Sequence, residues 1–174
     1  TTTLRVGLAG LGAIGGAVAD RLDAGIDGLS LVAVAARRHD KARQRMAPFR
    51  NQPTIMGLAE LADAADVVVE CAPAAVFSDI AEPAIEKGRI FVPASVGALL
   101  GRPDLIDRAA ETGARIIVPT GALLGLDAVR AAAEGDIHSV RMVTRKPPGG
   151  LAGAPPLIEN GISVDDLSEP LKVF

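Results

Sequence analysis

Three glycines, Gly10, Gly12 and Gly15, follow the apolar stretch 4–9 and precede a segment with helical apolar spacing. This GxGxxG pattern at a strand-to-helix turn is typical of a binding site for the pyrophosphate of a dinucleotide. Gly10 permits the tight turn, Gly12 leaves room for a phosphate near the backbone, and Gly15 lets the helix lie close to the strand. The helix N-terminus then presents free N–H groups and a partial positive charge. The alternative is a tight turn that binds no ligand.

A pair of arginines follows the second apolar stretch, residues 29–35. In NAD-selective folds of this kind, an acidic residue about 20 positions after the glycines binds the ribose hydroxyls. This sequence has Ala36, Arg37 and Arg38 at that place. Two guanidinium groups can bind a 2′-phosphate, so we predict that the protein uses NADP, or both NAD and NADP. The alternative is a solvated pair of charges at the start of a helix.

Three further apolar stretches are each followed by a loop of small or polar residues. These loops are Cys71–Pro73 after residues 66–70, Ala94–Ala98 after 89–93 and Thr120–Ala122 after 115–118. Ligands of a parallel sheet bind at the carboxyl ends of its strands, so we expect all the loops to meet at one cofactor site. Cys71 is expected to pack as a small apolar side chain, with a reactive thiol as the alternative.

Apolar strands alternate with helical stretches along the first 135 residues, which predicts a Rossmann-type α/β fold with a doubly wound parallel sheet. Residues 48–53 are expected to be irregular. In the first helix we expect Ile14, Ala17, Val18 and Leu22 to form the apolar face. The predicted strands are 4–9, 29–35, 66–70, 89–93 and 115–118, and the predicted helices are 14–22, 38–46, 58–65, 76–87, 103–112 and 126–134.

The pattern changes after Gly135. Residues 138–144 alternate like a half-exposed strand, and four prolines and three glycines follow in residues 145–156, which cannot continue a regular element. We therefore predict a dinucleotide-binding domain over 1–137 and, over 138–174, the incomplete start of a second α/β domain for substrate binding and dimerisation. Arg145 and Lys146 can bind a substrate carboxylate, or form a charged surface turn.

Composition excludes several classes of function. A net charge of −3 and 2% aromatic residues argue against a nucleic-acid partner. One cysteine gives neither a disulfide framework nor zinc-ligand spacing, so no metal site is expected. The sequence has no apolar run of about 18 residues and no recognisable secretory signal, which predicts a cytoplasmic protein without a membrane partner.

Several segments, taken together and in order, resemble the L-aspartate dehydrogenase family. They are GLAGLGAIGGAV, VVVECAP, VPASVGAL, ARIIVPTGALLGLDAVRAA and VRMVTRKPPGGLAGAP. The resemblance implies NAD(P)-dependent oxidation of L-aspartate to iminoaspartate, which feeds NAD biosynthesis or hydrolyses to oxaloacetate and ammonia. It also implies a Rossmann domain, a second α/β domain and a homodimer.

The family's site residues are transferred by motif. The resemblance implies that the glycine turn binds the pyrophosphate, that the loop after residues 66–70 lies beside the cofactor, and that the SVG segment borders the nicotinamide. The family's catalytic histidine, in an N-x-H segment, and a cofactor-binding asparagine are expected beyond Phe174, because His39 and His138 lie in the wrong segments. The implied cofactor residues are Gly10, Gly12, Ala13, Ile14, Gly15, Ala72, Pro73, Ser95, Val96, Gly97 and Ala122.

Two other functions remain open from the residues. One is a related two-domain reductase of the dihydrodipicolinate-reductase or homoserine-dehydrogenase kind, against which the TRKPP segment argues. The other is a nucleotide-binding paralogue without catalysis, which would explain why no convincing general base is found in these 174 residues.

Overall fold

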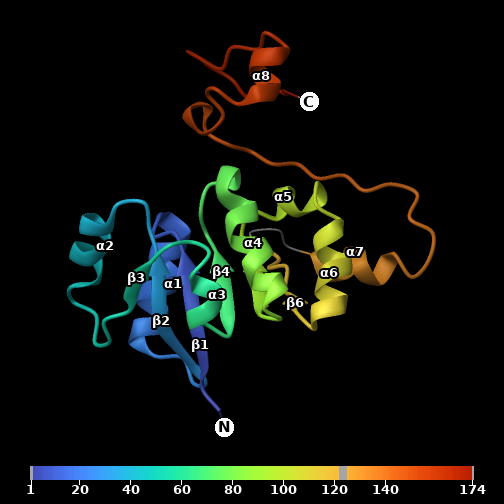
Figure 1. Ribbon diagram of the computed structural model, residues 1–174. Coiled ribbons are helices and arrows are strands. Elements are labelled where there is room, and N and C mark those ends of the chain that lie inside the picture. The colour runs from blue at the N-terminus through green and yellow to red at the C-terminus, as the bar shows by residue number, and fades with distance from the viewer. Residues whose placement is uncertain (1, 122–124, 174) are drawn as a thin grey trace. The chain divides into compact units, whose positions relative to one another are not determined.

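The computed structural model describes residues 2–121 and 125–173. The chain divides into two compact units, Thr1–Leu124 and Gly125–Phe174. In the first unit, helices lie on both faces of one sheet (Figure 1). Its elements are β1 (Leu4–Ala9), α1 (Ala13–Ala24), β2 (Leu29–Ala35), α2 (His39–Met46), β3 (Thr54–Met56), α3 (Leu61–Ala64), β4 (Val67–Glu70), η1 (Ala74–Val76), α4 (Phe77–Glu86), β5 (Ile90–Pro93), α5 (Val96–Leu100), α6 (Asp104–Thr112) and β6 (Arg115–Ile116).

All neighbouring strands of the described sheet are parallel, and their order is β3-β2-β1-β4-β5-β6. The chain therefore runs outward from β1 to β3, returns across the sheet, and runs outward again from β4 to β6. This is the strand order of a doubly wound dinucleotide-binding sheet. The predicted Rossmann-type α/β fold is confirmed, and the point where the order reverses lies between β1 and β4.

Successive residues of the strands pack on opposite faces, because strand side chains alternate. On one face, Val6, Leu8 and Val34 pack with α1 and α2. On the other face, Ala33 and Val68 belong to a second core with α3, α4 and α6. The sheet is thus buried on both sides, as its near-continuous apolar strands require.

The buried face of α1 differs from the predicted one. Ile14 is 62% exposed and Ala17 is also exposed, whereas Gly15, Gly16, Ala19 and Leu22 are buried. The expectation that Ile14 and Ala17 lie on the core face is therefore wrong. Small side chains let the helix axis approach the sheet closely, so Gly15, Gly16 and Ala19 lie on its buried face together with Leu22.

Other element boundaries also differ from the prediction. β3, Thr54–Met56, was not predicted because three residues carry too short a pattern, and it forms by pairing with β2. α5 occupies part of the predicted loop 94–98. The predicted helix 58–65 is helical only over Leu61–Ala64. Each of these short elements depends on neighbours that are distant in the sequence.

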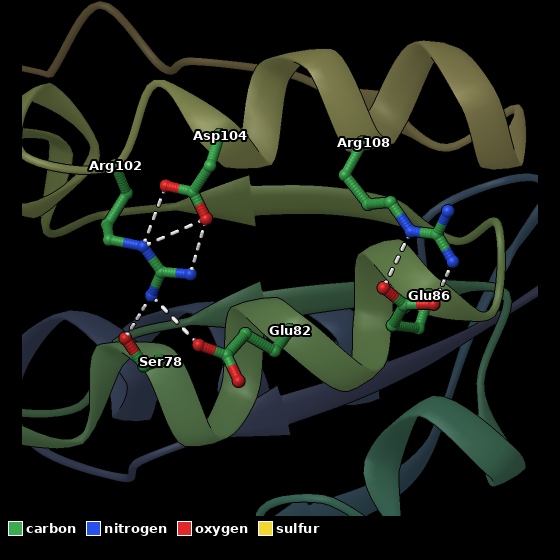
Figure 2. A network of polar contacts seen from close by, with 6 residues as sticks. All are labelled: Ser78, Glu82, Glu86, Arg102, Asp104 and Arg108. Carbon is green, nitrogen blue, oxygen red and sulfur yellow. Dashed lines mark hydrogen bonds and ion pairs between the residues drawn. The ribbon is translucent and has the colours of Figure 1, made fainter.

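An ion-pair network joins α4 to the start of α6 and to α6 itself (Figure 2). Arg102 donates to Ser78, Glu82 and Asp104, with shortest distances of 2.6, 2.9 and 2.7 Å. Arg108 donates to Glu86 at 2.6 Å. These groups are partly exposed, so each pair contributes little by itself. Together they link the exposed face of α4 to that of α6.

A second structural ion pair lies before β4. Asp66 accepts the Arg5 backbone N–H at 2.9 Å and the Arg5 guanidinium at 2.7 and 3.1 Å. These hydrogen bonds, with smaller contributions from the charges of Arg5 and Arg89, lower the pKa of Asp66 to about 2. The pair joins β1 to β4 at their amino ends.

The second unit contains α7 (Leu126–Ala132), η2 (Pro148–Gly150) and α8 (Pro155–Glu159), with Leu157 and Val164 buried. The prediction of a strand over 138–144 is wrong: a strand exists by pairing, and no described segment pairs with these residues. The two units divide before α7, whereas the predicted domain boundary follows residue 137; that boundary stays a prediction. Among the described residues, no helix is long and apolar enough to cross a membrane.

Candidate cofactor site at the carboxyl edge of the sheet

Backbone hydrogen bonds bring four loops together at the carboxyl ends of the strands. Gly10 N–H donates to the carbonyl of Ala35, and Cys71 N–H donates to the carbonyl of Ala9, each at 2.8 Å. Ala94 N–H donates to the carbonyl of Glu70 at 2.8 Å. The loops after β1, β2, β4 and β5 are therefore consecutive neighbours along one edge, as expected from the sequence.

The glycine turn is compact because two of its glycines have no room for a side chain. Gly10 has φ of 96°, and a Cβ there would lie 2.5 Å from the carbonyl oxygen of Cys71. A Cβ on Gly15 would lie 2.1 Å from the carbonyl oxygen of Gly10. Gly10 thus makes the turn against the loop after β4, and Gly15 brings α1 against the turn.

Gly12 differs from both neighbours. It is exposed, it precedes the first residue of α1, and a Cβ there would meet nothing within 4 Å. Protein packing therefore does not explain a glycine at this position. Open space in front of a helix N-terminus is what a pyrophosphate needs, so the turn fits a dinucleotide.

The other predicted residues of this region are exposed around the turn. Ala13 and Ile14 form the first turn of α1, and both are exposed. Arg37 and Arg38 are exposed between β2 and α2. Arg43 and Arg45 of α2 are paired with Asp40 and Asp20, whereas no carboxylate of the described residues pairs with Arg37 or Arg38.

The predicted site residues do not include Glu70, a buried carboxylate at the end of β4. Glu70 is 0% exposed and is the one charged side chain that is fully buried in the described part of the chain. It accepts Ala72 N–H at 2.9 Å, Ser95 N–H at 2.8 Å and Ser95 Oγ–H at 3.1 Å. The available signal was an acidic residue that ends the apolar run VVVE.

Cys71 is half-buried beside this carboxylate. Burial raises the pKa of the thiol, and the negative charge of Glu70 raises it further. A thiol with a raised pKa carries little thiolate at neutral pH and is a poor nucleophile. It also packs against the core that contains α1. These observations favour the predicted role as a small apolar side chain over a reactive thiol.

The remaining predicted residues fall into three groups. Ala72, Pro73, Ser95, Val96 and Gly97 lie at this edge, and Ser95 Oγ is 3.3 Å from the carbonyl oxygen of Ala72. Ala122 lies outside the described residues. Arg145 and Lys146 are exposed in the second unit, as is His138, and His39 is exposed at the first residue of α2.

A surface hollow of about 450 Å³ lies between α4 and α6. Its lining includes Glu82, Glu86, Arg102 and Arg108, which hydrogen-bond to one another or to adjacent side chains. Among the charged side chains that line it, Asp107 alone has no hydrogen-bond or ion-pair partner in the described residues, and Asp107 is exposed to solvent. The carboxyl edge of the sheet is therefore the better candidate site.

Comparison with known sequences supports a dinucleotide-binding role. A family model described as homoserine dehydrogenase, NAD binding domain, matches residues 10–119. The chain is 52% identical over 174 residues to an L-aspartate dehydrogenase of Bradyrhizobium diazoefficiens, covering 100% of this chain and 62% of that protein. It is 49% identical over 172 residues to L-aspartate dehydrogenase 3 of Bordetella bronchiseptica, covering 98% and 63%. The chain thus spans about three-fifths of the length of these relatives.

Solved structures agree on the fold. An NAD binding oxidoreductase from Klebsiella pneumoniae superposes with a TM-score of 0.61 at 24% identity, over 79% of this chain and 40% of that one. A scyllo-inositol dehydrogenase from Lactobacillus casei, solved with NAD(H) and scyllo-inositol, gives a TM-score of 0.59 at 13% identity, over 76% and 41%. The resemblance to the L-aspartate dehydrogenase family, stated above from the motifs, is confirmed by the sequence relatives.

Proposed function

Since this chain belongs to the family of homoserine dehydrogenase NAD-binding domains, we propose that it is the cofactor-binding part of an NAD(P)-dependent L-aspartate dehydrogenase. The whole protein would oxidise L-aspartate to iminoaspartate. The observation that carries this proposal is 52% identity, along all 174 residues, to a protein of that name. The open space at Gly12, in front of the N-terminus of α1, separately supports a bound pyrophosphate.

Each part of the carboxyl edge has a role in this proposal. The turn at Gly12 and the N-terminus of α1 bind the pyrophosphate. Ala72–Pro73 and Ser95–Gly97 border the nicotinamide and its ribose. A bound cofactor would supply the hydride acceptor for the substrate, and the residues of this edge would supply orientation and charge.

Further parts of the proposal concern the whole protein. Arg145 and Lys146 bind a carboxylate of the substrate, and the general base is the histidine that the family resemblance places beyond Phe174. The domains are 1–137 for the cofactor, and a second domain beginning at 138 for substrate and dimerisation. The protein is a cytoplasmic homodimer that feeds iminoaspartate to NAD biosynthesis. The single cysteine is compatible with a reducing compartment.

We expect the complete protein to reduce NAD⁺ or NADP⁺ in the presence of L-aspartate. Appearance of the reduced nicotinamide is followed by its absorbance, with L-homoserine and a reaction without amino acid as comparisons. Turnover of L-homoserine in preference to L-aspartate would favour the alternative of an enzyme of the homoserine-dehydrogenase kind. Cofactor binding without turnover of L-aspartate would favour the non-catalytic alternative.

The cofactor preference is expected to depend on Arg37 and Arg38. We expect NADPH to bind at least as tightly as NADH, because two exposed guanidinium groups face no carboxylate in the described residues. Replacing both arginines by alanine should weaken NADPH about tenfold, the equivalent of one charge-assisted hydrogen bond, and leave NADH unchanged. Titrations that follow nicotinamide fluorescence measure both affinities.

Arg43→Ala is the matched control, because Arg43 lies nearby on α2 but pairs with Asp40. It should change neither affinity. A strong preference of the unaltered protein for NADH would contradict the role of Arg37 and Arg38, while leaving cofactor binding itself intact.

A further inference from the structure

Glu70 forms hydrogen bonds to two different loops. Ser95, its partner in the second loop, lies 25 residues further along the chain. One donor is the Ala72 N–H in the loop after β4. The other two are the N–H and hydroxyl of Ser95, between β5 and α5. Burying a carboxylate is costly unless its oxygens are well bonded, so these contacts determine where both loops lie.

The same carboxylate also acts on the glycine turn through one peptide. The peptide that joins Cys71 to Ala72 is held by the bond from Ala72 N–H to Glu70. On its other side, the missing Cβ of Gly10 faces the carbonyl of Cys71 and the nitrogen of Ala72. Glu70 therefore holds the Ala72–Pro73 loop and Ser95 directly, whereas the glycine turn meets it only through this peptide and is also held by the bond from Gly10 N–H to Ala35.

Three converging donors require a carboxylate at this position. Oε1 accepts from Ala72 N–H and Ser95 Oγ–H, and Oε2 accepts from Ser95 N–H. A glutamine of the same shape would turn an NH₂ group toward one of the two backbone N–H groups. That donor-to-donor contact would push one loop away in either orientation of the amide.

We propose that Glu70 is the positioning residue for the nicotinamide half of the cofactor, holding the Ala72–Pro73 loop and Ser95 at the spacing that this half requires. The inference rests on the proposed cofactor role of this edge. Glu70 touches neither reactant; it acts through Ala72 and Ser95. The adenosine half, expected at the glycine turn and Arg37–Arg38, depends on it less.

Comparing a whole dinucleotide with its adenosine half tests this. Calorimetry measures the affinities of NADPH and 2′-phospho-ADP, or of NADH and ADP, whichever pair the unaltered protein binds more tightly. Glu70→Gln should weaken the dinucleotide about tenfold, and change the adenosine half by less than about twofold. A general loss of folded protein would lower both affinities together.

Asp66→Asn is the matched control. Asp66 also accepts a backbone N–H beside β4, but at the opposite end of the strand. It should lower thermal stability and leave the ratio of the two affinities unchanged. If Glu70→Gln does not fold, Glu70→Asp decides, since it keeps the carboxylate but shortens its reach to the N–H groups of Ala72 and Ser95. A selective loss of dinucleotide affinity in Glu70→Asp supports the proposal, and any other result overturns it.

The failure of this inference is distinguishable from failure of the proposed function. If the unaltered protein binds the dinucleotide and Glu70→Gln weakens both ligands equally, or neither, only the role of Glu70 is overturned. If the unaltered protein binds neither ligand, cofactor binding at this edge and the role of Glu70 are both overturned.

Discussion

Gly12→Ala is expected to weaken binding of NADH and NADPH by tenfold or more, while the protein remains folded. The added Cβ meets nothing within 4 Å in the protein, so it enters only the space proposed for the pyrophosphate. A displacement that costs one good hydrogen bond to a phosphate already accounts for about tenfold. Fluorescence titration with each reduced cofactor measures the affinity.

Thermal unfolding separates this effect from misfolding. Gly12 precedes α1 with φ of −70°, which alanine adopts easily, so the expected cost is no more than about 1 kcal/mol from a poorer cap. Gly101→Ala is the control: a Cβ there makes an ordinary 3.8 Å contact, outside the proposed site. Unchanged cofactor affinity in Gly12→Ala would mean that the pyrophosphate does not lie at this turn.

Gly15→Ala is expected to destabilise the fold itself, by about 3 kcal/mol. Its Cβ would lie 2.1 Å from the carbonyl oxygen of Gly10 and 3.2 Å from the Cβ of Cys71. Backbone cannot yield as a flexible side chain does, so α1 would have to move away from the turn. In a chain of this size, the midpoint of thermal unfolding should fall by about 10 °C.

The adjacent position provides the control for Gly15→Ala. A Cβ on Gly16 would approach Arg45 at 3.1 Å, at the far end of a flexible side chain that can shift. Alanine also favours the helix over glycine by about 1 kcal/mol. Gly16→Ala should therefore leave stability within about 1 kcal/mol of the original. Equal losses at both positions would show that helix packing in general, and not the contact with Gly10, requires the glycines.

The fold class and the place of the candidate site could be predicted because they depend on local patterns. Apolar runs such as 29–35 predict buried parallel strands, and β2 has those bounds. The carboxyl ends of such strands share one edge, so the loops after them had to meet. The glycine spacing predicted the turn, since Gly10 needs a positive φ that other residues rarely adopt.

Pairing and packing limited the rest of the prediction. β3 is too short to show a period and forms only beside β2. Residues 138–144 have an alternating pattern, but a pattern does not supply a partner strand. On α1, the large apolar side chain of Ile14 suggested burial, whereas the helix packs through the face that carries Gly15, Gly16, Ala19 and Leu22.

The sequence by itself determined the fold class, the glycine turn and the resemblance to L-aspartate dehydrogenases, because these reside in residue types and their spacing. Only the tertiary structure revealed that Glu70 is buried and hydrogen-bonded. A glutamate after three valines has no local reason to be buried, and its donors come from Ala72 and from Ser95 on the next strand's loop. Long-range hydrogen bonds of this kind produce no periodic pattern in the sequence, because the order of the strands in the sheet determines which residues become partners.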